Sequence, residues 1–197
     1  MVKEERIKAL NEKIINSYPN EKLVLGHGNL NSPIMLIGEA PGAKEIELGQ
    51  PFVGQAGKHL EEFLQVLEIK REDIYITNSV KYRPTKVNPK TGRLSNRTPT
   101  IKEIEDFREF VFEEIDIINP KIIVTLGNIP LKSLLEKSIK IGEVHGRLES
   151  IYINGNPYSI FPLYHPAAVI YNRDLREVYI SDLHKLKKEI DKIKNKH

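Results

Sequence analysis

The sequence contains no cysteine. This absence excludes disulfide bonds, a thiol nucleophile and any iron–sulfur or zinc site that uses thiolate ligands. Long apolar runs are missing too, because none approaches the ~18 residues of a membrane-spanning helix. The N-terminal segment MVKEERIKALNEKI is charged and lacks the apolar core of a signal peptide. We therefore expect a cytoplasmic protein with no membrane association and no metal.

The composition is otherwise that of an ordinary globular protein. The 197 residues are 40% hydrophobic and 29% charged, and a chain of this length can bury a good core of its own. Apolar residues recur at helical spacing over residues 3–16. We expect a single domain over residues 1–197, with this N-terminal helix and a core over about 26–197.

Acidic residues are absent from one stretch of the chain. The net charge of +3 argues only weakly for a nucleic-acid partner, but residues 81–97 carry six basic residues and no acid. Such a segment can bind phosphates. Basic surface loops are also common in proteins that bind no nucleic acid, so charge alone leaves both interpretations open. The six residues are Lys81, Arg83, Lys86, Lys90, Arg93 and Arg97.

Apolar runs alternate with amphipathic segments along the chain. Buried strands are predicted over 33–38, 73–80 and 121–126, and in YSIFPL after a turn at 154–156. Helices are predicted over 56–67, over 101–118, from about 130 and over 174–194. Thr100 and Glu103 have the spacing of a capping box at the start of the helix over 101–118. This alternation predicts an α/β fold, a three-layer α/β/α sandwich around a central, mainly parallel four-stranded sheet.

Polar residues follow several of these strands directly. Glu39 comes after the first strand, Asn78 ends the second, and His165 follows the last. Because ligands of open α/β sheets bind at the carboxyl ends of the strands, the three side chains are expected to converge on one edge. Each alone also has a structural explanation, as a helix cap, a turn residue or a satisfied buried histidine. Their occurrence at equivalent positions favours a site.

A glycine-rich stretch begins at the end of the first strand. GEAPGAKEIELGQPFVGQAG, from Gly38 to Gly57, contains five glycines and two prolines. Its spacing is neither the G-x-G-x-x-G of dinucleotide-binding folds nor the ending of a P-loop, which disfavours a nucleotide cofactor. The exposed backbone N–H groups of such a loop can still bind an anion or the edge of a base.

The ordered set GEAPG, PFVGQAG, TNSVKYRP, NRTPT and HPAAVI resembles the uracil-DNA glycosylase superfamily, most closely its fourth family, the thermostable iron–sulfur type. The resemblance extends from about Gly26 through the C-terminal helix. It implies a monofunctional, monomeric enzyme of base-excision repair. Such an enzyme binds uracil-containing DNA and hydrolyses the N-glycosidic bond of a uracil flipped out of the helix.

The resemblance also assigns roles to residues of the glycine-rich stretch and of the strand ends. Phe52 matches the phenylalanine that stacks on the flipped base, although a core phenylalanine is the alternative. Gly38 and Ala40 border the base. The carboxamide of Asn78 matches the group that reads the uracil edge. His165 matches the histidine that stabilises negative charge on the leaving uracil by a hydrogen bond to O2.

The first departure from the superfamily pattern concerns the acid of the pocket. Ala40 stands where the best-known family has an aspartate that orients water. Glu39 and Glu45 are the carboxylates left nearby. We expect Glu45 to form a pocket wall near uracil C5 and to assist with water. Glu39 is expected to direct its backbone N–H to the base and its side chain away.

A second departure concerns the metal. The fourth family binds a [4Fe–4S] cluster through four cysteines. Two would lie in the N-terminal region, where this chain has INSYPNE, and the other two align with Tyr82 and Phe107. Because aromatic residues stand at two of the cysteine positions, the resemblance implies that apolar packing replaces the cluster and that no cofactor is bound.

The remaining expectations concern contact with DNA. Lys81, Arg83 and Arg97 border the matched motifs and are predicted to bind DNA, and the basic segment 85–95 is longer than usual in the family. After the HPAA motif, Val169, Ile170 and Tyr171 are predicted to wedge into the minor groove. Arg173 would supply a charge beside them. The alternative is that Val169 and Ile170 pack under the C-terminal helix.

Two other functions stay open at this point. One is a glycosylase for another deaminated base, hypoxanthine or xanthine, although Asn78 favours uracil. The other is a catalytically weak, nucleic-acid-binding paralogue, such as a polymerase-associated domain. The joint presence of Phe52, Asn78 and His165 disfavours this second option. A Rossmann-type nucleotide binder is further away, because its glycine spacing and ribose-binding acid are absent.

Overall fold

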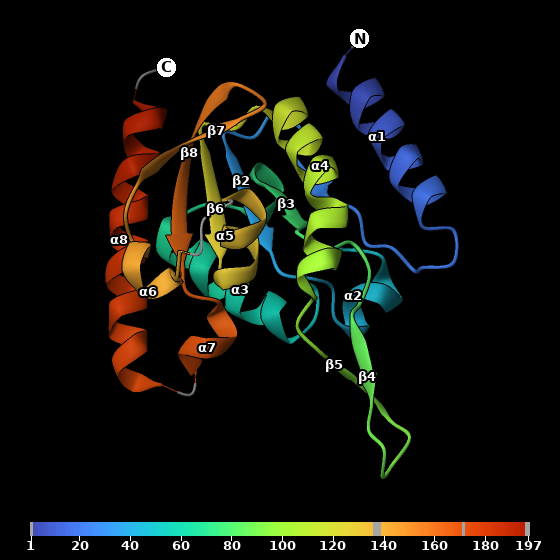
Figure 1. Ribbon diagram of the computed structural model, residues 1–197. Coiled ribbons are helices and arrows are strands. Elements are labelled where there is room, and N and C mark those ends of the chain that lie inside the picture. The colour runs from blue at the N-terminus through green and yellow to red at the C-terminus, as the bar shows by residue number, and fades with distance from the viewer. Residues whose placement is uncertain (1, 136–138, 171, 196–197) are drawn as a thin grey trace.

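A six-stranded sheet forms the centre of the protein in the computed structural model, which describes residues 2–135, 139–170 and 172–195 (Figure 1). The strand order is β1-β3-β2-β6-β8-β7. The strands are β1 (His27–Gly28), β2 (Ile34–Gly38), β3 (Tyr75–Asn78), β6 (Ile122–Leu126), β7 (Glu149–Ile153) and β8 (Asn156–Leu163).

The four middle strands run parallel, as predicted, and an antiparallel strand lies at each edge. The expected count of four strands was therefore wrong. β1 has only two residues, too few to give a sequence pattern. β7 forms a hairpin with β8 across the predicted turn at Asn154–Gly155, and only Ile151 and Ile153 of its five residues are buried.

Helices cover both faces of the sheet (Figure 1). The first layer contains α1 (Lys3–Ser17), α4 (Ile101–Ile118), α5 (Asn128–Leu134) and α6 (Ile141–Val144), and the second contains α3 (Gln55–Leu67), α7 (Pro166–Ile170) and α8 (Arg173–Lys194). These are the three layers expected from the alternation of strands and helices. None of the described helices is both long and apolar enough to cross a membrane.

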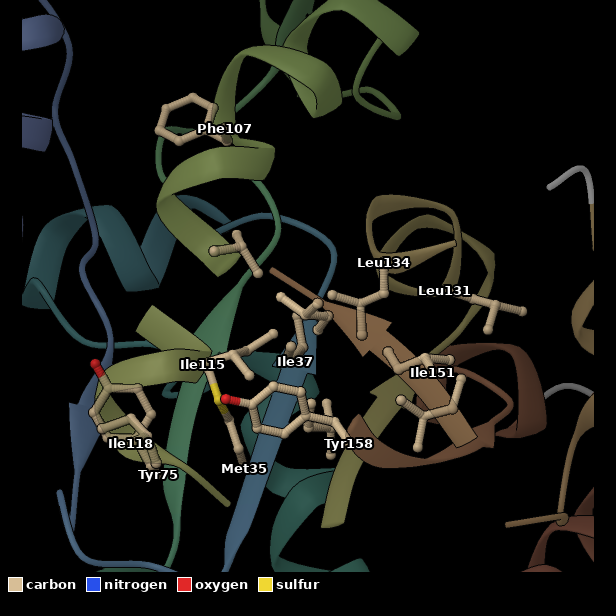
Figure 2. Close-up of a cluster of buried hydrophobic side chains, with 14 of the residues drawn as sticks. Met35, Ile37, Tyr75, Phe107, Ile115, Ile118, Leu131, Leu134, Ile151 and Tyr158 are labelled. Atoms are coloured by element: carbon tan, nitrogen blue, oxygen red, sulfur yellow. The ribbon is translucent and has the colours of Figure 1, made fainter. Parts of the chain in front are cut away.

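Alternate residues of the buried strands point into the two layers. In β2, Met35 and Ile37 belong to the core cluster under α4, where they meet Ile115 and Ile118 (Figure 2). Leu36, between them, belongs to the cluster on the opposite face. This alternation follows from the two-residue period of a strand, and it explains why parallel strands buried on both faces form continuous apolar runs in the sequence.

The predicted bounds of α4 are confirmed. Its capping box is formed, since Thr100 Oγ1 accepts from the Glu103 N–H (3.2 Å) and the Glu103 carboxylate accepts from the Thr100 N–H (2.7 Å). Asn119 ends the helix with φ = 50°, a left-handed conformation that asparagine tolerates better than most residues. In α1, Ile7, Leu10 and Ile14 are buried.

Two regions expected to be loops contain regular structure. A short helix, α2 (Ala43–Leu48), lies within the glycine-rich stretch. The basic segment after β3 is an antiparallel hairpin of β4 (Thr85–Val87) and β5 (Leu94–Asn96), which forms a separate two-stranded sheet. A 3-10 turn, Arg71–Asp73, leads into β3.

Candidate active site

A cavity of about 450 Å³ lies at the carboxyl ends of the parallel strands. Its wall includes residues from the ends of β2 and β3, from α2 and the start of α3, and from the turn after β8. Seven of the residues singled out in the sequence lie here: Glu39, Ala40, Glu45, Phe52, Asn78, Arg97 and His165. The convergence expected from the strand ends is therefore present in the structure.

Gly38 and Asn78 are direct partners in the register between β2 and β3. A Cβ atom at residue 38 would lie 2.5 Å from both the Phe52 ring and Oδ1 of Asn78. Glycine is therefore required here for the ring and the carboxamide to sit together. Asn78 is only 3% exposed, and within the described chain its carboxamide has no hydrogen-bond partner, so it is free to bind a ligand.

The backbone around Phe52 is held in an unusual conformation. Phe52 has φ = 53°, which is uncommon for a residue other than glycine. The Arg71 guanidinium fixes this turn by donating to the carbonyl oxygens of Pro51 (2.5 Å) and Phe52 (3.1 Å). Gly57 lets α3 approach, because a Cβ there would lie 2.2 Å from the Phe52 oxygen. Phe52 both belongs to the core cluster of α3 and lines the cavity.

Glu45 is buried and its carboxylate is bound to backbone. Oε2 accepts from the Gly42 N–H (3.1 Å), and Oε1 accepts from the N–H groups of Val53 (3.1 Å) and Gly54 (2.7 Å). Since Gly42 and Gly54 are the N-caps of α2 and α3, one carboxylate joins the two helix starts on either side of Phe52. Glu45 lines the cavity as expected, but its oxygens hold the loop together.

Glu39 differs from Glu45 in its environment. It is half-buried in the cavity wall, and no described residue forms a hydrogen bond with its carboxylate. Burial raises the pKa of Glu39, because removal from water disfavours the charged form. Glu39 thus belongs to the cavity wall, and the expected orientation of its side chain, away from the base, stays a prediction. A carboxylate with free oxygens and a raised pKa is the kind of group that binds water or a developing cation.

His165 stands opposite, in the turn after β8. Its Nδ1 accepts a hydrogen bond from the Ala167 N–H (3.2 Å), so in the neutral ring Nε2 carries the proton. Burial, with a smaller contribution from nearby His59, lowers the pKa of His165. The imidazole is therefore neutral at pH 7 and can donate one hydrogen bond through Nε2. Gly127, with φ = 94°, packs against the His165 Cβ.

His59, on α3, is a cavity residue that was not singled out in the sequence. It lines the cavity, and its buried Nε2 has no hydrogen-bond partner among the described residues. The sequence signal was a histidine in the apolar stripe of the helix, which is more often a core residue. Pro84 and Asn96, at the base of the β4–β5 hairpin, also line the cavity and were not expected there.

Lys81 corrects a prediction about DNA contact. Its side chain is fully buried, and its Nζ bonds the Glu114 carboxylate (2.6 Å) and the Thr77 hydroxyl. The Tyr75 hydroxyl donates to the same carboxylate (2.8 Å). Lys81 thus ties β3 to α4 and cannot reach a phosphate.

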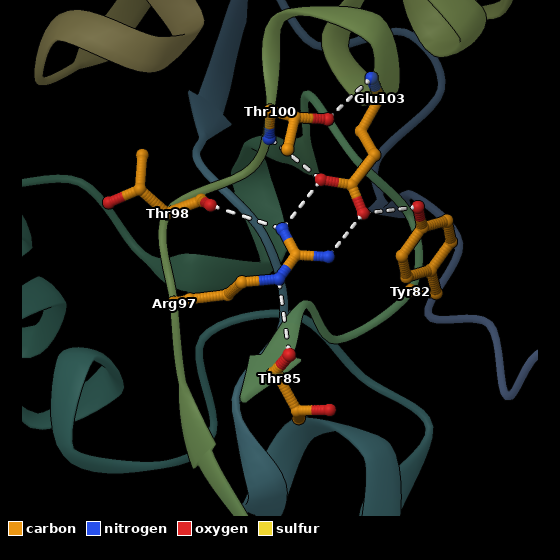
Figure 3. Close-up of polar contacts among 6 residues, drawn as sticks. All are labelled: Tyr82, Thr85, Arg97, Thr98, Thr100 and Glu103. Carbon is orange, nitrogen blue, oxygen red and sulfur yellow. Dashed lines mark hydrogen bonds and ion pairs between the residues drawn. The ribbon is translucent and has the colours of Figure 1, made fainter. Parts of the chain in front are cut away.

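Arg83 and Arg97 lie closer to the surface. Arg97 lines the cavity, and its guanidinium binds both oxygens of Glu103 at 2.7 Å (Figure 3). The Tyr82 hydroxyl donates to the same carboxylate (2.6 Å), and these partners hold the pKa of Glu103 well below its usual range. Arg83 donates from Nε to Oδ1 of Asn96 (2.7 Å). Neither contact excludes a second contact with DNA.

The predicted wedge is only partly described. Val169 is buried and belongs to the core cluster of α3 and α8, which is the packing alternative left open by the sequence. In this structure it is not an exposed wedge. The backbones of Ile170 and Arg173 lie in α7 and α8, but their side chains, and all of Tyr171, lie outside the described residues.

The two positions aligned with cluster-binding cysteines lie side by side. The rings of Tyr82 and Phe107 have centroids 5.6 Å apart, and Tyr18, from the N-terminal segment, stacks on Phe107 at 4.4 Å. Phe110 completes the group. Aromatic rings do not replace the thiolates that hold a [4Fe–4S] cluster, and the chain has no cysteine. The residues present therefore do not fit this cofactor.

Comparison with known proteins agrees with these motifs. The model of the uracil DNA glycosylase superfamily matches residues 25–193. A type-4 uracil-DNA glycosylase of Saccharolobus solfataricus is 40% identical over 172 residues, which cover 85% of this chain and 76% of that protein. One of Archaeoglobus fulgidus is 37% identical over 167 residues, covering 83% and 79%.

A larger protein also contains a similar region. A DNA polymerase of Bacillus phage SP01 is 34% identical over 165 residues, which cover 83% of this chain but 16% of the polymerase.

Proposed function

The chain belongs to the uracil DNA glycosylase superfamily, and from this premise we propose that it excises uracil from DNA in base-excision repair. The observation that carries the proposal is the meeting of Phe52, Asn78 and His165 in one cavity at the carboxyl ends of the sheet. These residues supply a stacking face, a group that reads a base edge and a hydrogen-bond donor. The substrate is a uracil nucleotide flipped out of the DNA stack.

Asn78 provides the choice of base. Its carboxamide can donate to uracil O4 and accept from N3–H, whereas cytosine has the opposite polarity at both atoms. Cytosine would leave buried polar groups without partners, and a mismatch of this kind is a strong form of discrimination. The Phe52 ring, fixed over Gly38, would stack on the same base.

His165 acts on the leaving group. Cleavage of the N-glycosidic bond builds negative charge on uracil and positive charge on the sugar. The Nε2–H of a neutral His165 would donate to uracil O2 as this charge develops, as donors do in an oxyanion hole. Its position is fixed before the substrate arrives by the Ala167 N–H and by Gly127.

Glu39 is the carboxylate assigned to the sugar and the water. It is the one of the two cavity carboxylates whose oxygens have no described partner, and the glycosyl cation needs a negative charge close by. Glu45 is assigned to positioning, because its oxygens accept three backbone N–H groups around Phe52. Ala40 leaves space beside Glu39 without adding a charge.

The enzyme is proposed to be monofunctional and monomeric. A lyase step needs an amine nucleophile with a lowered pKa, but Lys81 is paired with Glu114, and Lys44, on the cavity rim, is exposed and paired with Glu47. The protein would act in the cytoplasm on cellular DNA.

A panel of labelled oligonucleotides tests the proposal. Each carries uracil, hypoxanthine, xanthine or thymine, and alkali converts the abasic product into a strand break. We expect breaks with uracil, alkali-dependent because no lyase acts, and a strong loss with Asn78→Ala. Breaks with hypoxanthine or xanthine instead of uracil would reject the substrate, and no breaks on any oligonucleotide would reject the enzyme.

A further inference from the structure

The β4–β5 hairpin projects from the body of the protein at the end where the cavity lies (Figure 1). Residues 86–96 are all exposed, and the two strands pair with each other and not with the central sheet. An isolated two-stranded hairpin is only marginally stable in water. This exposed element is therefore not part of the core that holds the fold together.

The hairpin is nevertheless ordered and firmly attached. At its tip, the Asn88 N–H donates to the Arg93 carbonyl (2.9 Å) and the Asn88 side chain accepts from the Lys90 N–H (2.9 Å). At its base, the Arg97 guanidinium binds the Thr85 carbonyl (3.1 Å) and the Glu103 carboxylate (Figure 3). The arm is thus connected by defined bonds to a residue of the cavity wall.

One face of the hairpin continues the cavity wall outward. The cross-strand pairs Thr85–Asn96 and Val87–Leu94 share this face, because neighbouring pairs alternate between faces and Lys86–Ser95 lies between them. Asn96 lines the cavity. Leu94 is two residues along β5 from Asn96, and Val87 is its cross-strand partner. Both therefore lie about 7 Å farther out, on the face that carries Asn96.

This face presents apolar surface to solvent. Val87 is 61% exposed and Leu94 is 60% exposed, and the two are directly opposite each other. Paired apolar residues on an exposed arm indicate a surface that is covered when a ligand binds.

The charge of the arm identifies the ligand. Lys86, Lys90 and Arg93 are exposed, and none forms an ion pair with another described residue. The sequence has no acid between residues 81 and 97. A ligand that combines closely spaced negative charge with flat apolar groups, and that enters the adjoining cavity, is a DNA strand. A protein partner would account for the apolar pair but not for its continuity with the cavity.

We propose that the β4–β5 hairpin is a DNA-binding arm that holds the strand flanking the flipped nucleotide. Val87 and Leu94 contact sugars and bases of that strand, and Lys86, Lys90 and Arg93 contact its phosphates. The inference rests on the proposed function, because it takes the cavity to be the uracil site. It assigns recognition of the neighbouring nucleotides to residues outside the cavity.

The charge contribution is tested with Lys86→Gln, Lys90→Gln and Arg93→Gln combined. Binding to a single-stranded uracil oligonucleotide is measured between 50 and 300 mM salt, a range of about sixfold chosen to resolve the slope. Each lost phosphate contact lowers the slope of log affinity against log salt by about 0.7, so we expect a slope about 2 smaller. Affinity at low salt should fall by about tenfold or more. An unchanged slope would overturn the proposal.

The apolar contribution is tested with Val87→Thr and Leu94→Thr combined, since threonine keeps the preference for a strand. We expect weaker binding with the salt slope of the wild type. Tyr152→Thr is the matched control, because Tyr152 is 77% exposed on β7. Wild-type affinity in the double variant would remove the apolar contact from the proposal.

Two further controls separate the arm from the cavity and from the proposed function. Lys8→Gln, Lys188→Gln and Lys194→Gln remove the same charge on α1 and the C-terminal half of α8, away from the hairpin (Figure 1), and should leave the slope unchanged. Free uracil fills the cavity without a flanking strand, so both hairpin variants should bind it with the wild-type affinity. An equal loss of affinity for free uracil would mean that the variants disturb the cavity, and would contradict the proposal. If the wild type cleaves no substrate, the proposed function fails while the binding slopes still report on the arm.

Discussion

At the scale of single residues, Glu39 and Glu45 show how environment separates two identical side chains. Both line the cavity, but the oxygens of Glu45 accept three backbone N–H groups, whereas burial without described partners raises the pKa of Glu39. The resemblance assigned the water to Glu45 and expected Glu39 to direct its backbone N–H to the base. The hydrogen bonds of Glu45, on which we base the proposal of Glu39 for the water, come from loop geometry, which the sequence pattern does not specify.

The activity of Glu39→Gln should show this difference. Glu39 must be ionised to stabilise the sugar cation, so the wild-type rate should fall as pH decreases through its raised pKa. We expect Glu39→Gln to be slower at pH 7 by about 10²-fold and to lose this acid limb. Single-turnover rates between pH 4.5 and 8 measure both. Glu45→Gln should keep the limb, and a limb that persists unchanged in Glu39→Gln would show that another group titrates.

The same variant should be more stable than the wild type at neutral pH. A raised pKa in the folded state means that the protonated form of Glu39 contributes stability at low pH, and that this contribution is lost as pH rises through the folded pKa. Removing the charge should therefore raise Tm at pH 7 and change it little at pH 4. Thermal unfolding at the two pH values checks this. A lower Tm at pH 7 would indicate a partner for the ionised carboxylate.

At the scale of secondary-structure elements, a buried ion pair joins β3 to α4. Lys81 and Glu114 are 0% and 1% exposed, and Tyr75 and Thr77 bind the same carboxylate. Gly26 makes room for this group, because a Cβ there would lie 2.1 Å from the Glu114 carboxylate. In the sequence, Lys81 belongs to a basic run whose other members reach the surface, so the run did not indicate that this lysine is buried.

Lys81→Met should destabilise the fold by about 3–5 kcal/mol, because it leaves the Glu114 carboxylate buried without its cation. Adding Glu114→Gln removes that charge and should recover much of the loss. Urea unfolding of the two variants and the wild type measures the effect. A cost below about 1 kcal/mol for Lys81→Met, well under the usual range for such pairs, would contradict the buried pairing.

Elements with strong periodic patterns were predictable, and those defined by tertiary contacts were not. The bounds of α4 follow from its apolar stripe, its capping box and Asn119. In α1, Ile7, Leu10 and Ile14 form the buried stripe, whereas the apolar Ile15 is 48% exposed. Other elements are too short to show a period in the sequence: β1 has two residues, β4 and β5 have three each, and α2 has six. The convergence of Asn78 and His165 was predictable because strand ends share one edge.

At the scale of the whole molecule, aromatic packing joins the N-terminal segment to the site. Tyr18 stacks on Phe107, Phe107 meets Tyr82, and the Tyr82 hydroxyl binds the Glu103 that holds Arg97 in the cavity wall. This chain of contacts runs through the positions where the resemblance implies a metal cluster. The sequence shows that cysteine is absent, but only the structure shows that the aromatic residues at these positions pack against one another.

Packing should therefore take over the stabilising role of the cluster. We expect the purified protein to contain far less than one iron per chain and to keep its Tm and uracil release after treatment with a chelator. Phe107→Ala should cost about 3–5 kcal/mol of unfolding free energy, the usual range for a large-to-small change in a core. Iron analysis and urea unfolding measure these effects. Stoichiometric iron, with loss of activity on chelation, would contradict this account.

The central claim is that this cavity releases free uracil from DNA. Its most direct measurement is the single-turnover rate of uracil release from a single-stranded oligonucleotide, followed by chromatography, for the wild type and for folded His165→Ala. We predict release by the wild type and a rate lower by about 10²–10³ in the variant, the usual effect of removing one such donor. Release at the wild-type rate by His165→Ala, or none by the wild type, would contradict the account.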